Sequence, residues 1–185
     1  MYFFFVDDSI QNKPSRPGMG SMVAIGGVRV HADHVSVLEK CIQDICNDTG
    51  FPRDEEFKWS PGRYLWMRKN LVNKVREQFF IDILKEIQKY DVSISIVLED
   101  KNCKPAVSTC QSAQEDVILL FLERVQRQLK RFDTEGLIIV DRPSGNRSNE
   151  DVFLLNTLES IQAGTRFVDM ENIKQQHSLP MDTHD

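Results

Sequence analysis

The chain has no long hydrophobic run and few cysteines. None of its 185 residues belongs to a stretch approaching the roughly 20 apolar residues of a membrane span. Its aromatic first residues are followed at once by charged residues, and they have neither a basic region before them nor a small-residue cleavage site after them. We therefore do not expect a signal peptide. The four cysteines lack CxxC spacing, which argues against a zinc ribbon. We expect them to be free thiols in a cytoplasmic protein. They are Cys41, Cys46, Cys103 and Cys110.

The chain also lacks an excess of basic residues. The formal net charge is -5, which argues against coating nucleic acid by bulk electrostatics but permits an acidic metal site with local basic patches. There is no Walker loop, GxGxxG or GxSxG elbow, so nucleotide hydrolysis by a Walker loop, dinucleotide binding and serine-hydrolase chemistry have no support. A composition of 41% hydrophobic and 28% charged residues is typical of a globular protein.

Hydrophobic periodicity predicts strands that alternate with helices. The predicted strands are 2–6, 21–30, 92–100 and 136–141, and 54–60 is predicted to be a short strand or an extended segment. The predicted helices are 32–50, 65–90, 114–132 and 148–162. This order predicts an α/β fold with a mixed five-stranded sheet and helices on its faces. We expect the strands at 2–6, 92–100 and 136–141 to be parallel neighbours joined by right-handed crossovers.

Carboxylates follow each of these three apolar strands. They are the pairs Asp7–Asp8 and Glu99–Asp100, and the single residue Asp141. If the strands run parallel, these acids gather at one edge of the sheet, where ligands bind in open α/β folds. Crowded carboxylates repel one another, and a hard divalent cation relieves that repulsion. Solvated turns at the strand ends are the alternative interpretation.

Several motifs in this order resemble the large domain-of-unknown-function 3800 family. They are "FFFVDDS", "GGVRV" with the helix after it, "EEFKWS" and "LIIVDRPSGN". The resemblance covers residues 1–169 and implies an RNase H-like domain with metal-dependent nuclease activity. Residues 170–185 would then form an irregular polar tail.

The resemblance also implies a set of catalytic residues. Asp7, Glu56 and Asp141 would be ligands of Mg²⁺ or Mn²⁺, and Lys58 would lie beside them. We expect supporting roles for Asp8 and for the acids of the 92–100 strand, Glu99 and Asp100. Solvated side chains are the alternative for these supporting acids.

Basic residues near the motifs are candidate substrate ligands. Arg63 and Arg142 are the main candidates, and an anion could also bind the Ser-Gly-Asn loop before the last predicted helix. Further basic residues of the 65–90 helix could contact a nucleic-acid backbone or simply be solvated: Arg68, Lys69, Lys74 and Arg76. His31 and His34 have metal-ligand spacing but no evident third ligand.

The chain departs from the family at its end. The family usually closes with a segment resembling Gln-Leu-Ala-Asp, but "IKQQHSLPMDTHD" stands here. We therefore expect either a metal-dependent nuclease or a non-catalytic module of the same fold that binds nucleic acid or protein. A third hypothesis is that a lost C-terminal segment leaves apolar surface exposed and promotes dimers. No membrane partner is expected, and the oligomeric state stays open.

Overall fold

A computed structural model describes residues 1–13, 20–55, 57–58, 61–100, 113–140, 161–162, 164 and 168–174. The chain divides into two compact units. The first combines residues 1–30 with residues 93–185, and the second is residues 31–92. No helix in the described part of the chain is long and apolar enough to cross a membrane.

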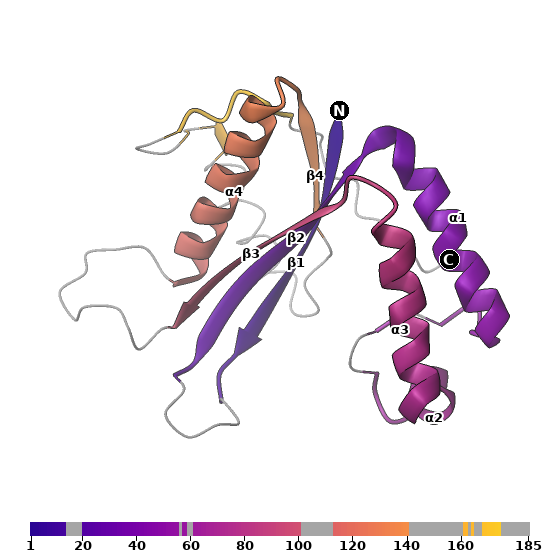
Figure 1. The fold of residues 1–185 in the computed structure, drawn as a ribbon. Coiled ribbons are helices and arrows are strands. Elements are labelled where there is room, and N and C mark those ends of the chain that lie inside the picture. The colour runs from indigo at the N-terminus through magenta and orange to yellow at the C-terminus, as the bar shows by residue number, and fades with distance from the viewer. Residues whose placement is uncertain are drawn as a thin grey trace. The chain divides into compact units, whose positions relative to one another are not determined.

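The first unit is built on a five-stranded mixed sheet with the order β3-β2-β1-β4-β5 (Figure 1). The strands are β1 (Tyr2–Gln11), β2 (Met22–His31), β3 (Ser93–Asp100), β4 (Gly136–Val140) and β5 (Ile173–Lys174). β1 pairs with β4 in parallel, as does β4 with β5, whereas β2 and β3 are antiparallel. Figure 1 shows β2 running back along β1. The predicted α/β class and mixed sheet are therefore confirmed.

Two predictions about the strands were wrong. β3 is not a neighbour of β1, because β2 lies between them and β3 forms one edge of the sheet. β1 does not end at Val6 but continues to Gln11, so Asp7 and Asp8 lie inside the strand. Local apolar patterns mark where a strand lies but do not specify its partners, which long-range contacts decide.

One face of this sheet is covered by helix α4 (Ala113–Arg131), which confirms the helix predicted at 114–132. Phe4 and Val6 alternate along β1 toward this face and are 1% and 4% exposed. They pack in one core with apolar residues of α4 and neighbouring strands, among them Val23, Ile25, Val97, Phe121, Val125 and Leu129. Gly27 permits this close packing, because a Cβ there would lie 2.5 Å from Cζ of Phe121.

The buried amide side chain of Gln126 attaches the chain beyond residue 168 to α4. Gln126 donates from Nε2 to Oδ1 of Asn172 at 2.8 Å, and the Asn172 backbone N–H donates to Oε1 of Gln126 at 3.1 Å. Met170 and Ile173 join the core of the first unit. Residues 170–174 are the described part of the range expected to form an irregular polar tail; these two apolar side chains are buried there, and β5 pairs with β4.

The second unit contains three helices: α1 (Ala32–Thr49), α2 (Trp66–Asn70) and α3 (Asn73–Ile87). Its separate core consists of Cys46, Phe51, Met67, Leu71, Phe79 and Ile83. α1 ends as predicted at Gly50, whose φ of 73° is the left-handed conformation that favours glycine. Residues 54–55 and 57–58 of the predicted short strand are not in a strand.

The single helix predicted over 65–90 is broken between α2 and α3. Val72 is extended, with φ -122° and ψ 150°, and Asn73 has a φ of 51°. Asn adopts positive φ more readily than most residues, so this position tolerates the break. Leu71 is buried at the break. The helix predicted at 148–162 lies outside the described residues except for its last two positions, which are helical.

Candidate functional site

Asp7 and Asp8 face opposite sides of the sheet. Side chains alternate along a strand, so Asp8 shares the α4 face with Phe4 and Val6, whereas Asp7 lies on the other face with Phe5. Asp7 is exposed, and its Oδ1 accepts the backbone N–H of Asp8 at 2.8 Å. Asp8 is half-buried. The two carboxylates are thus not arranged to bind one cation together.

The register of β1 and β4 relates Asp7 to Asp141, another of the predicted ligands. Val6 is paired with Val140, the last residue of β4. Asp7 follows Val6 in the sequence, and Asp141 follows Val140. Asp141 and Arg142 themselves lie outside the described residues. The parallel pairing of β1 and β4 is therefore established up to the residue that precedes each of these two acids.

The two acids of β3 lie farther from Asp7 along the sheet. Glu99 pairs with Val23 of β2, and Asp100 pairs with Met22. Because β2 separates β3 from β1, the two outer backbones are about 10 Å apart at the usual strand spacing. By alternation, Asp100 shares the face of Ile96 and Leu98 that is turned away from α4, whereas Glu99 lies on the α4 face.

The "EEFKWS" motif lies in the second unit, next to α2. Glu56 and Trp59 are outside the described residues. Their neighbour Glu55 accepts the backbone N–H of Trp66 at 2.6 Å and that of Met67 at 3.1 Å. The Lys58 backbone N–H lies 3.3 Å from Sδ of Met67. Glu55 and Lys58 therefore both contact residues of α2.

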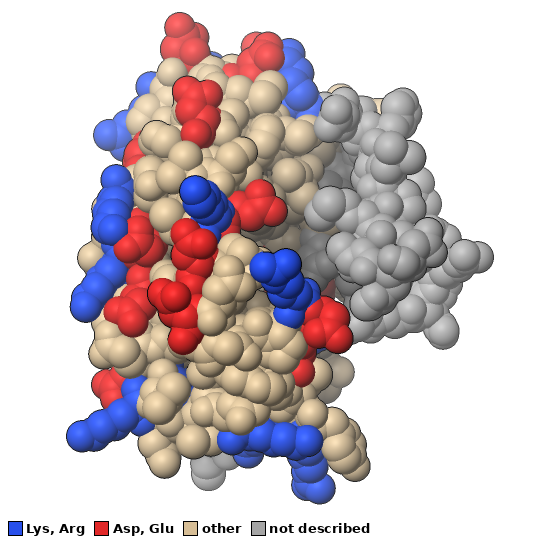
Figure 2. Space-filling view, turned by 90° about the vertical axis from the view of Figure 1, so that its right-hand side faces the viewer, with Lys and Arg blue, Asp and Glu red and all other residues tan. Residues whose placement is uncertain are grey.

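A nearby basic segment gives the second unit a charged end. Arg63, Arg68, Lys69 and Lys74 are all exposed, and Tyr64 among them is 90% exposed. Figure 2 shows Lys and Arg at the lower end of this side, and further Lys and Arg interspersed with Asp and Glu above it. Tyr64 is not among the residues predicted from the sequence to have a role. The sequence does mark the surrounding segment as basic, because residues 57–76 contain no Asp or Glu.

His31 and His34 are located at the start of α1. His31 caps the helix, since its Nδ1 accepts the Asp33 N–H at 3.4 Å, and the two imidazole centroids are 5.8 Å apart. No group of three His, Cys, Asp or Glu side chains able to hold a metal occurs among the residues that the structure describes. Two of the three predicted ligands are not among those residues.

A scan against protein-family models gave no match, and neither did a search of curated proteins.

Proposed function

We propose that this protein is an RNase H-like, divalent-metal-dependent nuclease or a related phosphodiester-processing enzyme. The observation that carries the proposal is the parallel register of β1 and β4. Its last pair is Val6 and Val140, and each of these residues is followed in the sequence by an aspartate. Consecutive Cα atoms are about 3.8 Å apart and neighbouring strands about 4.8 Å, so the register favours an approach of the two aspartates just beyond the last observed pair.

The topology of the sheet supports the fold part of the proposal. The sheet has the order β3-β2-β1-β4-β5, with β1, β4 and β5 parallel and β2 and β3 antiparallel. This agrees with the mixed five-stranded sheet expected for the proposed fold. The resemblance of "FFFVDDS", "EEFKWS" and "LIIVDRPSGN" to one family of that fold is a second, independent support.

In the proposed enzyme, Asp7 and Asp141 would hold the cation through carboxylate oxygens, the ligands that Mg²⁺ and Mn²⁺ prefer. Asp7 fits this role, because its carboxylate is exposed and one oxygen is oriented by the Asp8 amide. A bound cation would lower the pKa of a coordinated water and stabilise charge on a phosphoryl group. Arg142 would bind substrate phosphate, with Asp8, Glu99 and Asp100 as lower-ranked supporting acids.

A cleavage assay tests the proposal. The wild-type chain is incubated with single- and double-stranded DNA and RNA in Mg²⁺, Mn²⁺, Ca²⁺ or EDTA. We expect cleavage in Mg²⁺ or Mn²⁺, none in EDTA, and a loss of at least about 100-fold in Asp7→Asn, because an amide lacks the charge that holds a hard cation. Asp44→Asn, an exposed change on α1, is the matched control and should cleave like the wild type.

Two outcomes would contradict the nuclease proposal. One is the absence of any metal-dependent cleavage across the four substrates. The other is cleavage that persists unchanged in Asp7→Asn, which would indicate a contaminating nuclease or a different site.

The second candidate function is a non-catalytic module that binds nucleic acid. The observation that favours it is the cluster of exposed basic residues around α2, which does not depend on the sheet-edge carboxylates. This candidate requires that a double Asp7→Asn, Glu56→Gln variant keep its affinity for nucleic acid. Loss of affinity in that variant would exclude it in favour of a metal-dependent interaction.

A further inference from the structure

We propose that the end of the second unit around α2 is a binding surface for single-stranded nucleic acid. The basic surface consists of Arg63, Tyr64, Arg68, Lys69 and Lys74. It deepens the proposed function by naming a substrate class, but it uses none of the candidate metal ligands.

The charge of this surface is unusual for the chain. The whole sequence carries 28 acidic and 23 basic residues, yet residues 57–76 contain six Lys or Arg and no acid. Within the described ranges, none of the four cations of the basic surface forms an ion pair with a carboxylate. Elsewhere in the same unit, lysines do pair, as Lys85 does with Asp82. Four exposed cations are thus available to phosphate groups.

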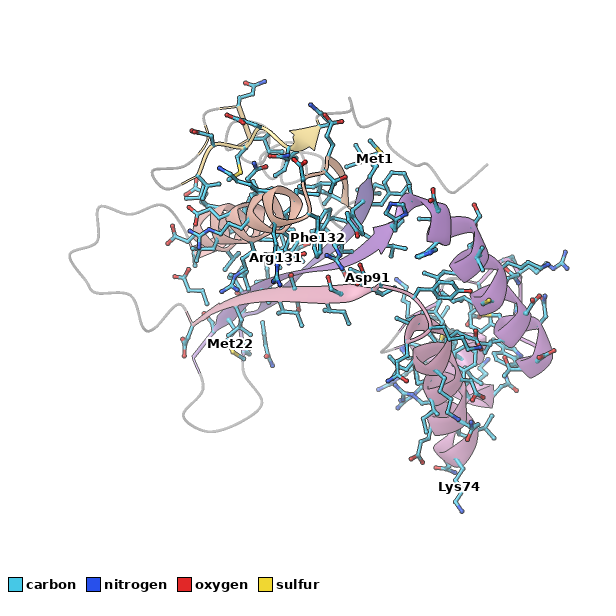
Figure 3. All side chains as sticks on the ribbon, turned by 45° about the horizontal axis from the view of Figure 1, so that its top comes forward. Met1, Met22, Lys74, Asp91, Arg131 and Phe132 are labelled. Carbon is cyan, nitrogen blue, oxygen red and sulfur yellow. The ribbon has the colours of Figure 1, made fainter. Side chains whose placement is uncertain are left out.

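Packing beneath the surface holds these side chains on a fixed support. Met67 is 1% exposed and Leu71 is 3% exposed, so α2 is anchored in the core of the second unit. The Glu55 carboxylate holds the first turn of the helix through two backbone N–H groups. Arg68 and Lys69 therefore project from an anchored turn. Figure 3 shows Lys74 at the far end of the unit, pointing away from its helices.

Tyr64 indicates which polyanion the surface fits. Aromatic side chains usually bury much of their area, but Tyr64 is 90% exposed and stands in the turn directly before α2. A ring presented beside Arg63 can stack on an unpaired base while the cations follow the backbone. In a duplex the bases are already stacked on one another, so the ring has less to gain. The combination therefore favours a single strand.

Binding is measured by fluorescence anisotropy in EDTA, so that it depends on neither a cation nor cleavage. The probes are a single-stranded oligonucleotide of about 20 nucleotides and the matching duplex. We expect the wild type to bind the single strand with a Kd on the order of 10 µM or tighter in about 50 mM salt. Asp7→Asn should bind equally well, so failure of the metal proposal would leave this result unchanged.

Two variants of the surface separate its charges from its ring. Arg63→Gln, Arg68→Gln, Lys69→Gln and Lys74→Gln together should weaken binding at least about tenfold and reduce the salt slope by roughly 3, at about 0.7 per phosphate contact. Tyr64→Ala should weaken single-strand binding about tenfold with the salt slope unchanged, and Tyr64→Phe should restore it. Duplex binding should respond little to either change at Tyr64.

The matched control removes four exposed charges elsewhere: Lys40→Gln, Arg124→Gln, Lys130→Gln and Arg131→Gln. It has the same net charge as the surface variant and should bind within about threefold of the wild type. Equal weakening in both variants would overturn the proposal, because only net charge would then matter. Tighter binding to phosphatidylserine vesicles than to the oligonucleotide, lost in the surface variant, would overturn it in favour of a membrane surface.

Discussion

The carboxylate of Glu55 accepts the backbone N–H of Trp66 at 2.6 Å, where helix α2 begins. The other oxygen accepts the Met67 N–H at 3.1 Å. These donors have no partner within the helix, and a carboxylate also interacts favourably with the positive end of the helix dipole. Glu55 therefore performs the capping that Leu65, the residue at the N-cap position, does not supply with its side chain.

Glu55→Gln should destabilise the protein by about 1–2 kcal/mol, because the amide oxygen replaces only one of two acceptors and carries no charge. Urea unfolding measures the free energy, and hydrogen exchange at the Trp66 and Met67 amides should accelerate. Glu77→Gln, an exposed change on α3, is the control and should leave both quantities unchanged. Unaltered exchange at the two amides would contradict the capping role.

Asp7→Asn and Asp8→Asn should differ in their response to Mn²⁺, because the two side chains lie on opposite faces of the sheet. We expect Asp7→Asn to abolish the rise in melting temperature caused by Mn²⁺. Its stability without metal should stay equal or rise, since it removes a negative charge near other acids. Asp8→Asn should retain the Mn²⁺ response. Thermal melts with and without Mn²⁺ measure this, and a larger effect at Asp8 would reverse the assignment.

Arg29 should stabilise the fold through its contacts with two aromatic rings. It is 4% exposed, and its Cζ lies 4.6 Å from the ring centroids of both Tyr2 and Phe132. A planar guanidinium suits such contacts better than an ammonium, so Arg29→Lys should cost about 1–2 kcal/mol. A double-mutant cycle of Arg29→Met with Phe132→Leu should give a coupling of about 1 kcal/mol in urea unfolding. A coupling near zero would exclude an energetic role for the ring.

Ionisation of the Cys46 thiol should make the free energy of unfolding depend on pH in the alkaline range. Burial in the second core raises the pKa of the Cys46 thiol above its ordinary value of 9.0. The folded state then holds the proton more tightly than the unfolded chain, so this stabilisation is complete below pH 9.0 and is lost as the pH rises through the folded pKa. In Cys46→Ala, the free energy of unfolding should fall less steeply above that pH. Urea titrations of both proteins under reducing conditions measure the difference, and identical slopes would contradict it.

Much of the local structure could be predicted from the sequence. The apolar period of α4, the alternation of β3 and the position of Gly50 after α1 were each interpreted correctly, because every one of them depends on neighbours within a few residues. Less of the candidate site could be predicted from the sequence. The acids could be named from their place after apolar runs, but the side of the sheet that each one faces depends on register, which Phe4 and Val6 fix by packing under α4.

The sequence by itself determined most of the helices and strands, and it showed that acids follow three of the apolar runs. The tertiary structure alone decided that β2 lies between β1 and β3, that Leu71 is buried where α2 ends, and that Ile173 adds a strand to β4. The preference of the backbone for helix or strand depends on a few neighbouring residues, so it can be predicted from the local sequence. Strand partners and buried anchors are chosen by contacts between residues far apart in the chain, and those contacts exist only after the core has formed.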